Sequence, residues 1–218
     1  MPKQIKPAIF VFCEGESEIE YANFLKEHFR DVVAIQKPVK GTFLKAQANF
    51  RGAPKFRDYA SETDEIWFFF DVDEEQGDVA KWNDRLQIIN ELRKLRKKPN
   101  IKVRLLMTTA CIEYWLYLHF QKTQPSLKTT ADKDKMLKAL VAIAPNYKKG
   151  DKSSIYQIAA HYQTAILNGT WSIAQLRAEN VPKGDSEDAI NKWLYTNSKT
   201  FSNVQDAIVF LEGLRAKR

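Results

Sequence analysis

Apolar residues in the first half of the chain form short unbroken runs that alternate with segments of helical periodicity. The runs at 8–13, 66–70 and 101–107 are typical of strands buried on both faces, and residues 32–35 predict a shorter strand. Helical spacing predicts helices over about 17–30, with Ser17 as N-cap, and over 43–50 and 79–95. Because strands that alternate with helices favour right-handed crossovers, we expect an α/β fold with a mostly parallel sheet flanked by helices.

The second half of the chain has a different pattern. From residue 121 onward helical periodicity dominates and no strand is predicted. The expected helices lie at 135–143, 154–167, 172–176, 187–195 and 203–214. We therefore predict an α/β domain over residues 1–122 and a helical region over 123–218 that packs on it or is appended to it.

Composition narrows the cellular setting. No run approaches the roughly 18 apolar residues that cross a bilayer, and the first residues show no secretory pattern, so we expect a cytoplasmic protein with no membrane partner. The formal charge of +7 favours an anionic partner, with nucleic acid first. Cys13 and Cys111 lie in apolar stretches, and we interpret both as core residues because no Cys/His spacing suggests zinc.

Acidic residues follow each of the three longer strands at its carboxyl end. In chain order they are Glu14, Asp71, Asp73 and Glu113. Glu18 lies four residues beyond Glu14, so the two side chains can face one point from adjacent helical turns. Because the carboxyl ends of parallel strands meet at one edge of a sheet, we expect these side chains to gather there.

Clustered carboxylates repel one another unless a proton or a cation compensates the charge. Mg²⁺ and Mn²⁺ prefer carboxylate oxygen and water, and they commonly neutralise phosphate oxygens and activate water. Individually, Asp71 could be a helix N-cap and Glu14 a dipole-stabilising acid. The Asp71 and Asp73 pair, leaving a buried strand together, nevertheless favours a site for Mg²⁺ or Mn²⁺.

Basic residues are concentrated between residues 36 and 63, where Phe43, Phe50 and Phe56 are interleaved with them. The candidate nucleic-acid-binding cations are Lys37, Lys40, Lys45, Arg51, Lys55 and Arg57. Cations with aromatic residues among them can hold a nucleic-acid backbone and stack on bases. A surface helix with its apolar face turned inward explains the same pattern, and the sequence leaves both interpretations open.

Other polar residues have both a functional and an ordinary structural interpretation. Lys148 and Lys149 precede Gly150, where a lysine could neutralise phosphate in a transition state or simply lie in a solvated loop. His119 lies in an apolar helical segment, so a core histidine is favoured over a metal ligand. The chain has no glycine-rich dinucleotide-binding motif and no Walker-type phosphate loop, so any ATP-driven step would require a partner.

Four short blocks carry a family resemblance. They are Phe-Cys-Glu-Gly-Glu-Ser-Glu at 12–18, Phe-Asp-Val-Asp-Glu at 70–74, Cys-Ile-Glu-Tyr-Trp-Leu-Tyr-Leu-His-Phe at 111–120 and Tyr-Lys-Lys-Gly-Asp at 147–151. In this order they resemble the signature blocks of the RloB-like (AbiL) family over residues 8–165. The first two also resemble the Toprim fold of topoisomerases, primases and overcoming-lysogenisation-defect nucleases. The chain departs from the family pattern at 108–110, where Thr-Thr-Ala stands in place of Ser-Asn-Pro.

The resemblance implies a Toprim-like sheet with a catalytic edge. By it, Asp71 and Asp73 would hold Mg²⁺ or Mn²⁺, Glu14 would be a metal ligand or general acid/base, and Glu18 and Glu113 would complete or flank the site. It also supports the catalytic interpretation of the lysine pair at 148–149.

The activity that the resemblance implies is phosphodiester cleavage of DNA or RNA, with tRNA among the candidates. The setting would be prokaryotic antiphage defence by abortive infection, with a partner ATPase, and a homo-oligomer is left open. The alternative is a non-catalytic Toprim-fold module that regulates or binds nucleic acid together with that ATPase.

Overall fold

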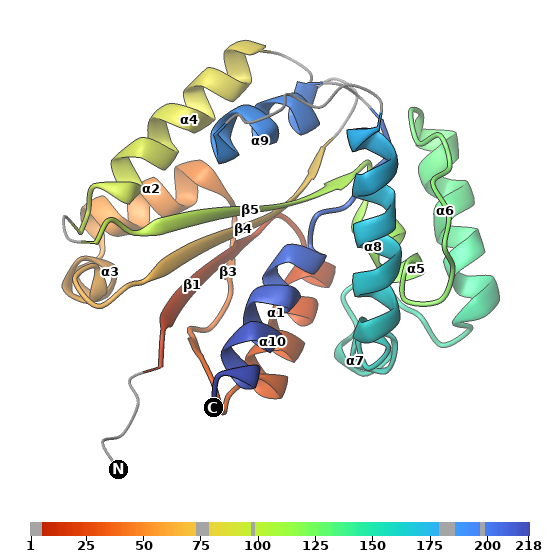
Figure 1. Cartoon of the computed structure of the whole chain (residues 1–218), viewed down its shortest axis with the longest axis horizontal. Helices are drawn as coiled ribbons and strands as arrows, with labels where there is room; N and C mark the ends of the chain where they lie inside the picture. Colours follow the sequence, from red (N-terminus) through yellow and green to blue (C-terminus); the bar gives the residue numbers. More distant parts are fainter. Residues whose placement is uncertain (1–5, 73–78, 97–98, 179–185, 197–198) are drawn as a thin grey trace.

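The computed structural model describes residues 6–72, 79–96, 99–178, 186–196 and 199–218, and a parallel sheet lies at its centre (Figure 1). The strands are β1 (Ala8–Cys13), β2 (Ala34–Ile35), β3 (Val39–Lys40), β4 (Glu65–Val72) and β5 (Lys102–Thr109). Their order is β2-β1-β4-β5, and β3 pairs with the same edge of β1 as β2 does. All these pairings are parallel, which confirms the predicted fold class.

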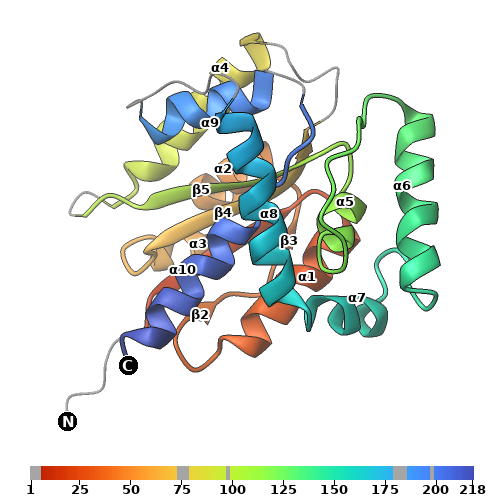
Figure 2. The same ribbon diagram turned by 45° about the vertical axis from the view of Figure 1, so that its right-hand side comes forward.

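Helices cover both faces of the sheet (Figures 1 and 2). One face carries α2 (Phe43–Gly52), α3 (Pro54–Tyr59), α4 (Val79–Arg93) and α9 (Glu187–Thr196). The other is covered by α1 (Glu16–His28) and α10 (Gln205–Ala216). On that side α7 (Lys152–Ala159) packs on α1, α8 (Tyr162–Arg177) packs on α10, and α6 (Thr130–Ile143) packs on α5 (Ile112–Tyr117), which follows β5. Among the described residues, no helix is long and apolar enough to cross a membrane.

Alternation along the strands explains why their sequences are apolar without interruption. In β4, Phe68 and Phe70 belong to the core beneath α2 and α4, whereas Trp67 and Phe69 belong to the core beneath α1 and α10. Each face of the strand therefore meets its own helical layer, and neither face can tolerate polar residues at its centre. The middle of β4 pairs on one side with β1 and on the other with β5.

Several predicted boundaries were wrong. The second long strand does not stop at Phe70, because Asp71 and Val72 continue the pairing opposite Thr108 and Thr109 of β5. Asp71 is therefore a strand residue and not a helix N-cap. The N-cap of α1 is Gly15 and not Ser17, since the Ser17 hydroxyl instead accepts a hydrogen bond from a distant backbone N–H.

The predicted helix at 154–167 is in fact two helices, α7 and α8, and the predicted gap at 168–171 lies within α8. Tertiary contacts explain the continuity of α8. The Asn168 amide donates a 2.8 Å hydrogen bond to the carbonyl of Leu118. At Gly169, a Cβ atom would lie 2.5 Å from Gln205 Oε1 and 3.2 Å from the Trp115 ring, so glycine permits this close approach.

The helical region contributes directly to the sheet and its core. A segment near Ser202 runs antiparallel to the end of β5 and forms an isolated bridge with Thr108, where the sequence predicted no extended structure. Asn203 fixes this segment: its side chain accepts from the Met107 N–H at 2.6 Å and donates to the Leu105 carbonyl at 2.9 Å. The following helix, α10, then buries Ile208 and Leu211 in the core that covers β1 and β4.

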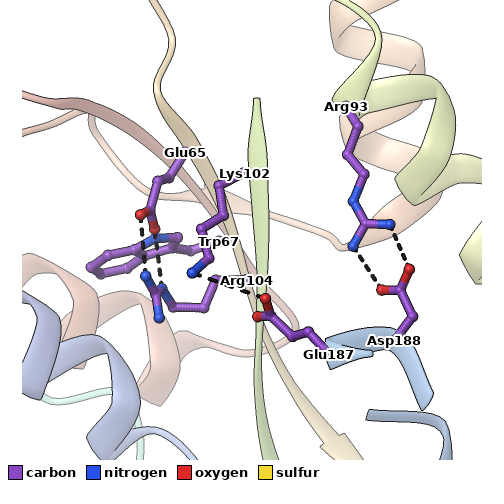
Figure 3. Close-up of polar contacts among 7 residues, drawn as sticks. All are labelled: Glu65, Trp67, Arg93, Lys102, Arg104, Glu187 and Asp188. Carbon is purple, nitrogen blue, oxygen red and sulfur yellow. Dashed lines mark hydrogen bonds and ion pairs between the residues drawn. The ribbon is translucent and has the colours of Figure 1, made fainter. Parts of the chain in front are cut away.

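Polar contacts join β4, β5 and α9 near the start of β5 (Figure 3). Arg104 donates two hydrogen bonds to the buried Glu65 carboxylate, at 3.0 and 3.1 Å, and Trp67 donates a third at 2.6 Å. The Arg93 guanidinium of α4 forms a bidentate pair with Asp188 of α9, with both bonds at 2.7 Å. Bidentate geometry of this kind fixes orientation as well as distance, so it aligns α9 with α4.

Candidate carboxylate site

The first two acids of the site end neighbouring strands. Glu14 follows β1, and its N–H donates a 3.0 Å hydrogen bond to the Phe69 carbonyl, which continues the ladder with β4. Its carboxylate turns back across the same edge, where Oε2 accepts a 3.1 Å hydrogen bond from the Asp71 N–H. The two residues therefore lie side by side at the carboxyl edge of the sheet, as their positions after parallel strands predict.

Glu18 brings a third carboxylate into the site from the first turn of α1, and its side chain is buried. Burial raises its pKa to about 7, and the charges of Glu113 and Glu14 add to this increase. Gly15 makes room for this carboxylate, because a Cβ atom at that position would lie 2.7 Å from Glu18 Oε2. The protein thus holds a carboxyl group that titrates near neutral pH close to two other acids.

Glu113 is the fourth acid and is also buried, with an exposure of 2%. The chain reaches it through a tight turn in which Ala110 has a φ of 68°, an uncommon conformation for a residue with a side chain. The Tyr147 hydroxyl donates a 2.9 Å hydrogen bond to Glu113 Oε1, and the Lys149 ammonium lies 3.7 Å from the same oxygen. A charge-assisted hydrogen bond and a nearby cation therefore compensate the buried carboxylate.

The loop at 147–151 joins this site to the start of α1. Ser17 Oγ accepts a 3.0 Å hydrogen bond from the Gly150 N–H and lies 3.4 Å from the Tyr147 hydroxyl. Gly150 has a φ of 72°, and a Cβ atom there would lie 2.9 Å from the Cβ of Glu16. A glycine is thus required both by the backbone conformation and by the close packing.

Four of the five predicted metal ligands, Glu14, Glu18, Asp71 and Glu113, lie near the carboxyl edge of the sheet, where the charges of Glu14 and Glu113 act on Glu18 and the Asp71 N–H bonds to Glu14. The fifth, Asp73, lies outside the described residues. Within the ranges that are described, no three His, Cys, Asp or Glu side chains are grouped so that they could hold a metal ion. The donor set is nevertheless chemically suited to Mg²⁺ or Mn²⁺, because its carboxylate oxygens are the ligands that hard cations prefer and its buried acids repel one another.

The two candidate lysines are placed differently. Lys149 faces the buried carboxylate of Glu113, although its own side chain is largely exposed. Lys148 is exposed. It lies near Asp151, whose pKa is lowered mainly by hydrogen bonds from Ser154 and to a smaller extent by the charge of Lys148. Of these two lysines, Lys149 is therefore the one that forms an ion pair with a candidate acid within the described part of the chain.

Sequence reasoning missed the positioning roles of Tyr147 and Ser17. The only signal for Tyr147 was its place at the start of the 147–151 block. Ser17 was misread as a helix cap because serine before a helical pattern usually has that function. Neither contact could be inferred from spacing, since Ser17 and Tyr147 lie 130 positions apart.

The basic segment at 36–63 keeps its cations at the surface. Its six candidates, Lys37, Lys40, Lys45, Arg51, Lys55 and Arg57, are all exposed. Lys40 pairs with Glu16 at 2.6 Å and Arg51 pairs with Glu91 at 2.6 Å. Phe43 and Phe50 are buried in the core and Phe56 is partly buried, so the inward-facing interpretation of these aromatics is correct.

The remaining candidates have structural roles. His119 is buried, its Nε2 lies 3.1 Å from the Tyr21 hydroxyl, and its Nδ1 lies 3.0 Å from the Trp115 carbonyl oxygen. Burial lowers its pKa to about 3, so it remains neutral at physiological pH. Cys13 and Cys111 are both buried free thiols, as expected of core residues.

The order of the blocks and the geometry at the sheet edge can now be set beside known proteins. The family model for RloB-like protein matches residues 9–209 of the chain. The chain belongs to the RloB-like family. No curated protein and no solved structure matches this RloB-like chain. The matched range includes all four acids described above and extends through the helical region to α10.

Proposed function

We propose that this RloB-like protein has a Toprim-type catalytic edge and is a Mg²⁺- or Mn²⁺-dependent nuclease that hydrolyses phosphodiester bonds in DNA or RNA. The observation that carries the proposal is the electrostatic coupling of the buried Glu18 to Glu14 and Glu113, together with the contact of Glu14 with Asp71, at the carboxyl edge of the sheet. Buried carboxylates that repel one another lower the stability of the fold. They are nevertheless common in active sites that bind a metal cation and a phosphate group.

The residues of the edge divide the chemistry between them. A bound Mg²⁺ or Mn²⁺ would neutralise phosphate oxygens and lower the pKa of a bound water. The main ligands of this metal ion would be Glu14, Asp71 and Asp73, because in sequence they lie at the carboxyl ends of the adjacent strands β1 and β4. With a pKa of about 7, Glu18 can exchange a proton near neutral pH, as a general acid or base must. Lys149 supplies a positive charge beside Glu113 for the phosphate.

The proposed setting is a prokaryotic antiphage system in which a partner ATPase restrains or triggers cleavage. The chain itself has no Walker-type phosphate loop, so ATP hydrolysis would have to come from that partner. The excess of positive charge on the chain is consistent with a nucleic-acid substrate.

The test uses purified protein incubated with total RNA, plasmid and single-stranded DNA, with Mg²⁺, with Mn²⁺ and with a chelator. Wild type should cleave one of these substrates only with metal, and Asp71→Asn should reduce cleavage by at least about 100-fold, since a transition-state charge interaction is lost. Asp58→Asn makes the same change at an exposed position on α3 and should cleave as wild type does. Equal cleavage by Asp71→Asn and wild type would exclude this edge as the catalytic site.

If the wild type leaves every substrate intact, a candidate partner ATPase of the proposed defence system should be added together with ATP. Cleavage that then depends on Asp71 supports a nuclease that requires its partner. Intact substrates under these conditions would instead favour the non-catalytic module, which binds nucleic acid or the ATPase without turnover.

A further inference from the structure

A pocket of about 490 Å³ opens between the start of α2 and the first half of α4. Lys45 lines it from α2, and Lys81, Asp84 and Arg85 line it from α4. Three cations and one acid give these walls a net charge of +2. Lys81 and Arg85 have no role in the proposed catalytic edge. The size of the pocket lies within the range of about 300–1,000 Å³ that is typical of small-molecule sites.

The pocket adjoins the carboxylate edge. Gly41, on its wall, donates a 2.7 Å backbone hydrogen bond to the carbonyl of Cys13, the residue that immediately precedes Glu14. The charge of Glu14 also acts on Arg85: burial lowers the pKa of this guanidinium, and Glu14 partly offsets that effect. A ligand in the pocket would therefore lie next to the acids and not on a remote surface.

Arg85 is held in place by aromatic rings. Its guanidinium carbon lies 5.1 Å from the Phe43 ring centre, 4.9 Å from that of Phe70 and 4.9 Å from that of Tyr195. Contacts of this kind between a cation and aromatic faces restrict the side chain. A guanidinium fixed in advance can bind a phosphate with less loss of conformational entropy than a free lysine can.

The remaining walls are apolar. Leu44 is 74% exposed on the α2 side of the pocket, and the largely buried Ile88 lines it from α4. An anion alone would need no apolar wall, whereas a nucleotide presents a phosphate beside an apolar sugar and base. The combination of cations and exposed aliphatic surface thus fits a nucleotide better than it fits a free inorganic anion.

We infer that this pocket binds a nucleotide of a single nucleic-acid strand, next to the phosphodiester placed at the carboxylate edge, with Arg85, Lys81 and Lys45 contacting its phosphate. The inference rests on the proposed nuclease function for the position of the scissile bond. It adds two cations from α4 to the substrate-binding surface and assigns Lys45 a specific contact.

The experiment measures binding of fluorescein-labelled eight-nucleotide single strands, RNA and DNA, by anisotropy in the presence of a chelator. The protein carries Asp71→Asn so that no strand is cut. Adding Lys45→Ala and Lys81→Ala should weaken binding by at least about 10-fold and reduce the slope of log affinity against log salt by up to about 0.7, as expected when one phosphate is no longer neutralised. Lys138→Ala, an exposed change on α6, is the matched control and should bind normally.

Arg85→Gln removes the charge and keeps a polar side chain, and thermal unfolding shows whether this variant remains folded. If it is folded, it should also bind at least about 10-fold more weakly. The inference would be overturned if the Lys45→Ala/Lys81→Ala variant bound the strand as tightly as Lys138→Ala does. Competition by a free nucleoside monophosphate as strong as that by the unlabelled strand would overturn the assignment to a strand.

These outcomes are independent of catalysis. Weaker strand binding in the pocket variants would support the pocket even if Asp71→Asn showed that the edge does not cleave. Normal strand binding in those variants would exclude the pocket even if cleavage depended on Asp71.

Discussion

The Tyr147 hydroxyl donates a 2.9 Å hydrogen bond to the buried carboxylate of Glu113, across 34 positions of sequence. Tyr147 lies in the loop between α6 and α7, whereas Glu113 lies in the first turn of α5, next to the sheet edge. This contact links the helical region to the candidate site. The fourth family block therefore completes the site even though it contributes no acid to the cluster.

Removing this hydroxyl should destabilise the fold. Tyr147→Phe leaves the Glu113 carboxylate buried with one donor fewer, and we expect a loss of about 1.5–3 kcal/mol in the free energy of unfolding. Urea denaturation followed by circular dichroism measures the change. Tyr59→Phe removes a hydroxyl at an exposed position and should cost less than about 0.5 kcal/mol. Equal stability of the two variants would mean that the Tyr147 bond contributes nothing.

Glu18 should make stability depend on pH. The folded protein keeps this proton up to about pH 7, whereas the unfolded carboxyl releases it near 4.5. Between these values the folded state binds more protons, so the contribution of Glu18 to stability falls as the pH rises, by at most about 1.4 kcal/mol per pH unit. Urea titrations from pH 4.5 to 8 should show a shallower fall for Glu18→Gln than for wild type. The exposed Glu62→Gln variant should follow the wild-type curve.

Gly15→Ala should disturb the site without unfolding the protein. The added Cβ would lie 2.7 Å from Glu18 Oε2, but that oxygen ends a side chain that can move, and the extended backbone of Gly15 suits alanine. We expect the free energy of unfolding to change by less than about 1 kcal/mol. The proposed nuclease activity should fall by at least about 10-fold, because a small displacement of a catalytic group slows the reaction strongly. The pH dependence attributed to Glu18 should also shift.

The control for this change is Gly213→Ala in α10, where a Cβ atom meets no neighbour within 4 Å. That variant should gain about 0.5–1 kcal/mol in stability, because alanine favours a helix more than glycine does, and should retain full activity. Activity that survives Gly15→Ala would show that the position of the Glu18 carboxylate does not matter for catalysis.

Arg104→Met should be strongly destabilising. The variant removes two hydrogen bonds to Glu65 and leaves that buried carboxylate without its cation, at an expected cost of about 3–5 kcal/mol. Changing Glu65→Gln in the same chain keeps an acceptor for the Trp67 indole and removes the charge, so it should recover more than half of the loss. Thermal and urea unfolding of the single and double variants measure this. A double variant no more stable than Arg104→Met would argue against a charge effect.

Sequence pattern alone determined the long strands of the sheet and the acids that follow them, but it missed the short strand β3. Strands covered on both faces must be apolar throughout, so the runs at 8–13 and 66–70 identified β1 and β4 to within a few residues. The convergence of Glu14 and Asp71 followed from strand direction, since the ends of parallel strands share an edge. The family blocks added the order of the site residues along the chain.

Tertiary packing decided the rest. Ser17 contacts Gly150 across 133 positions and Asn203 fixes the edge of β5, contacts that no local period encodes because they depend on how separate helices dock. The prediction left a gap at 168–171 inside the single helix α8, where the close approach of Gly169 to Gln205 and Trp115 is visible only in the folded chain. Arg85 showed no signal in sequence, because the rings that hold it come from three different elements. Local periodicity thus determined which residues form strands, and long-range packing determined which side chains meet at the site.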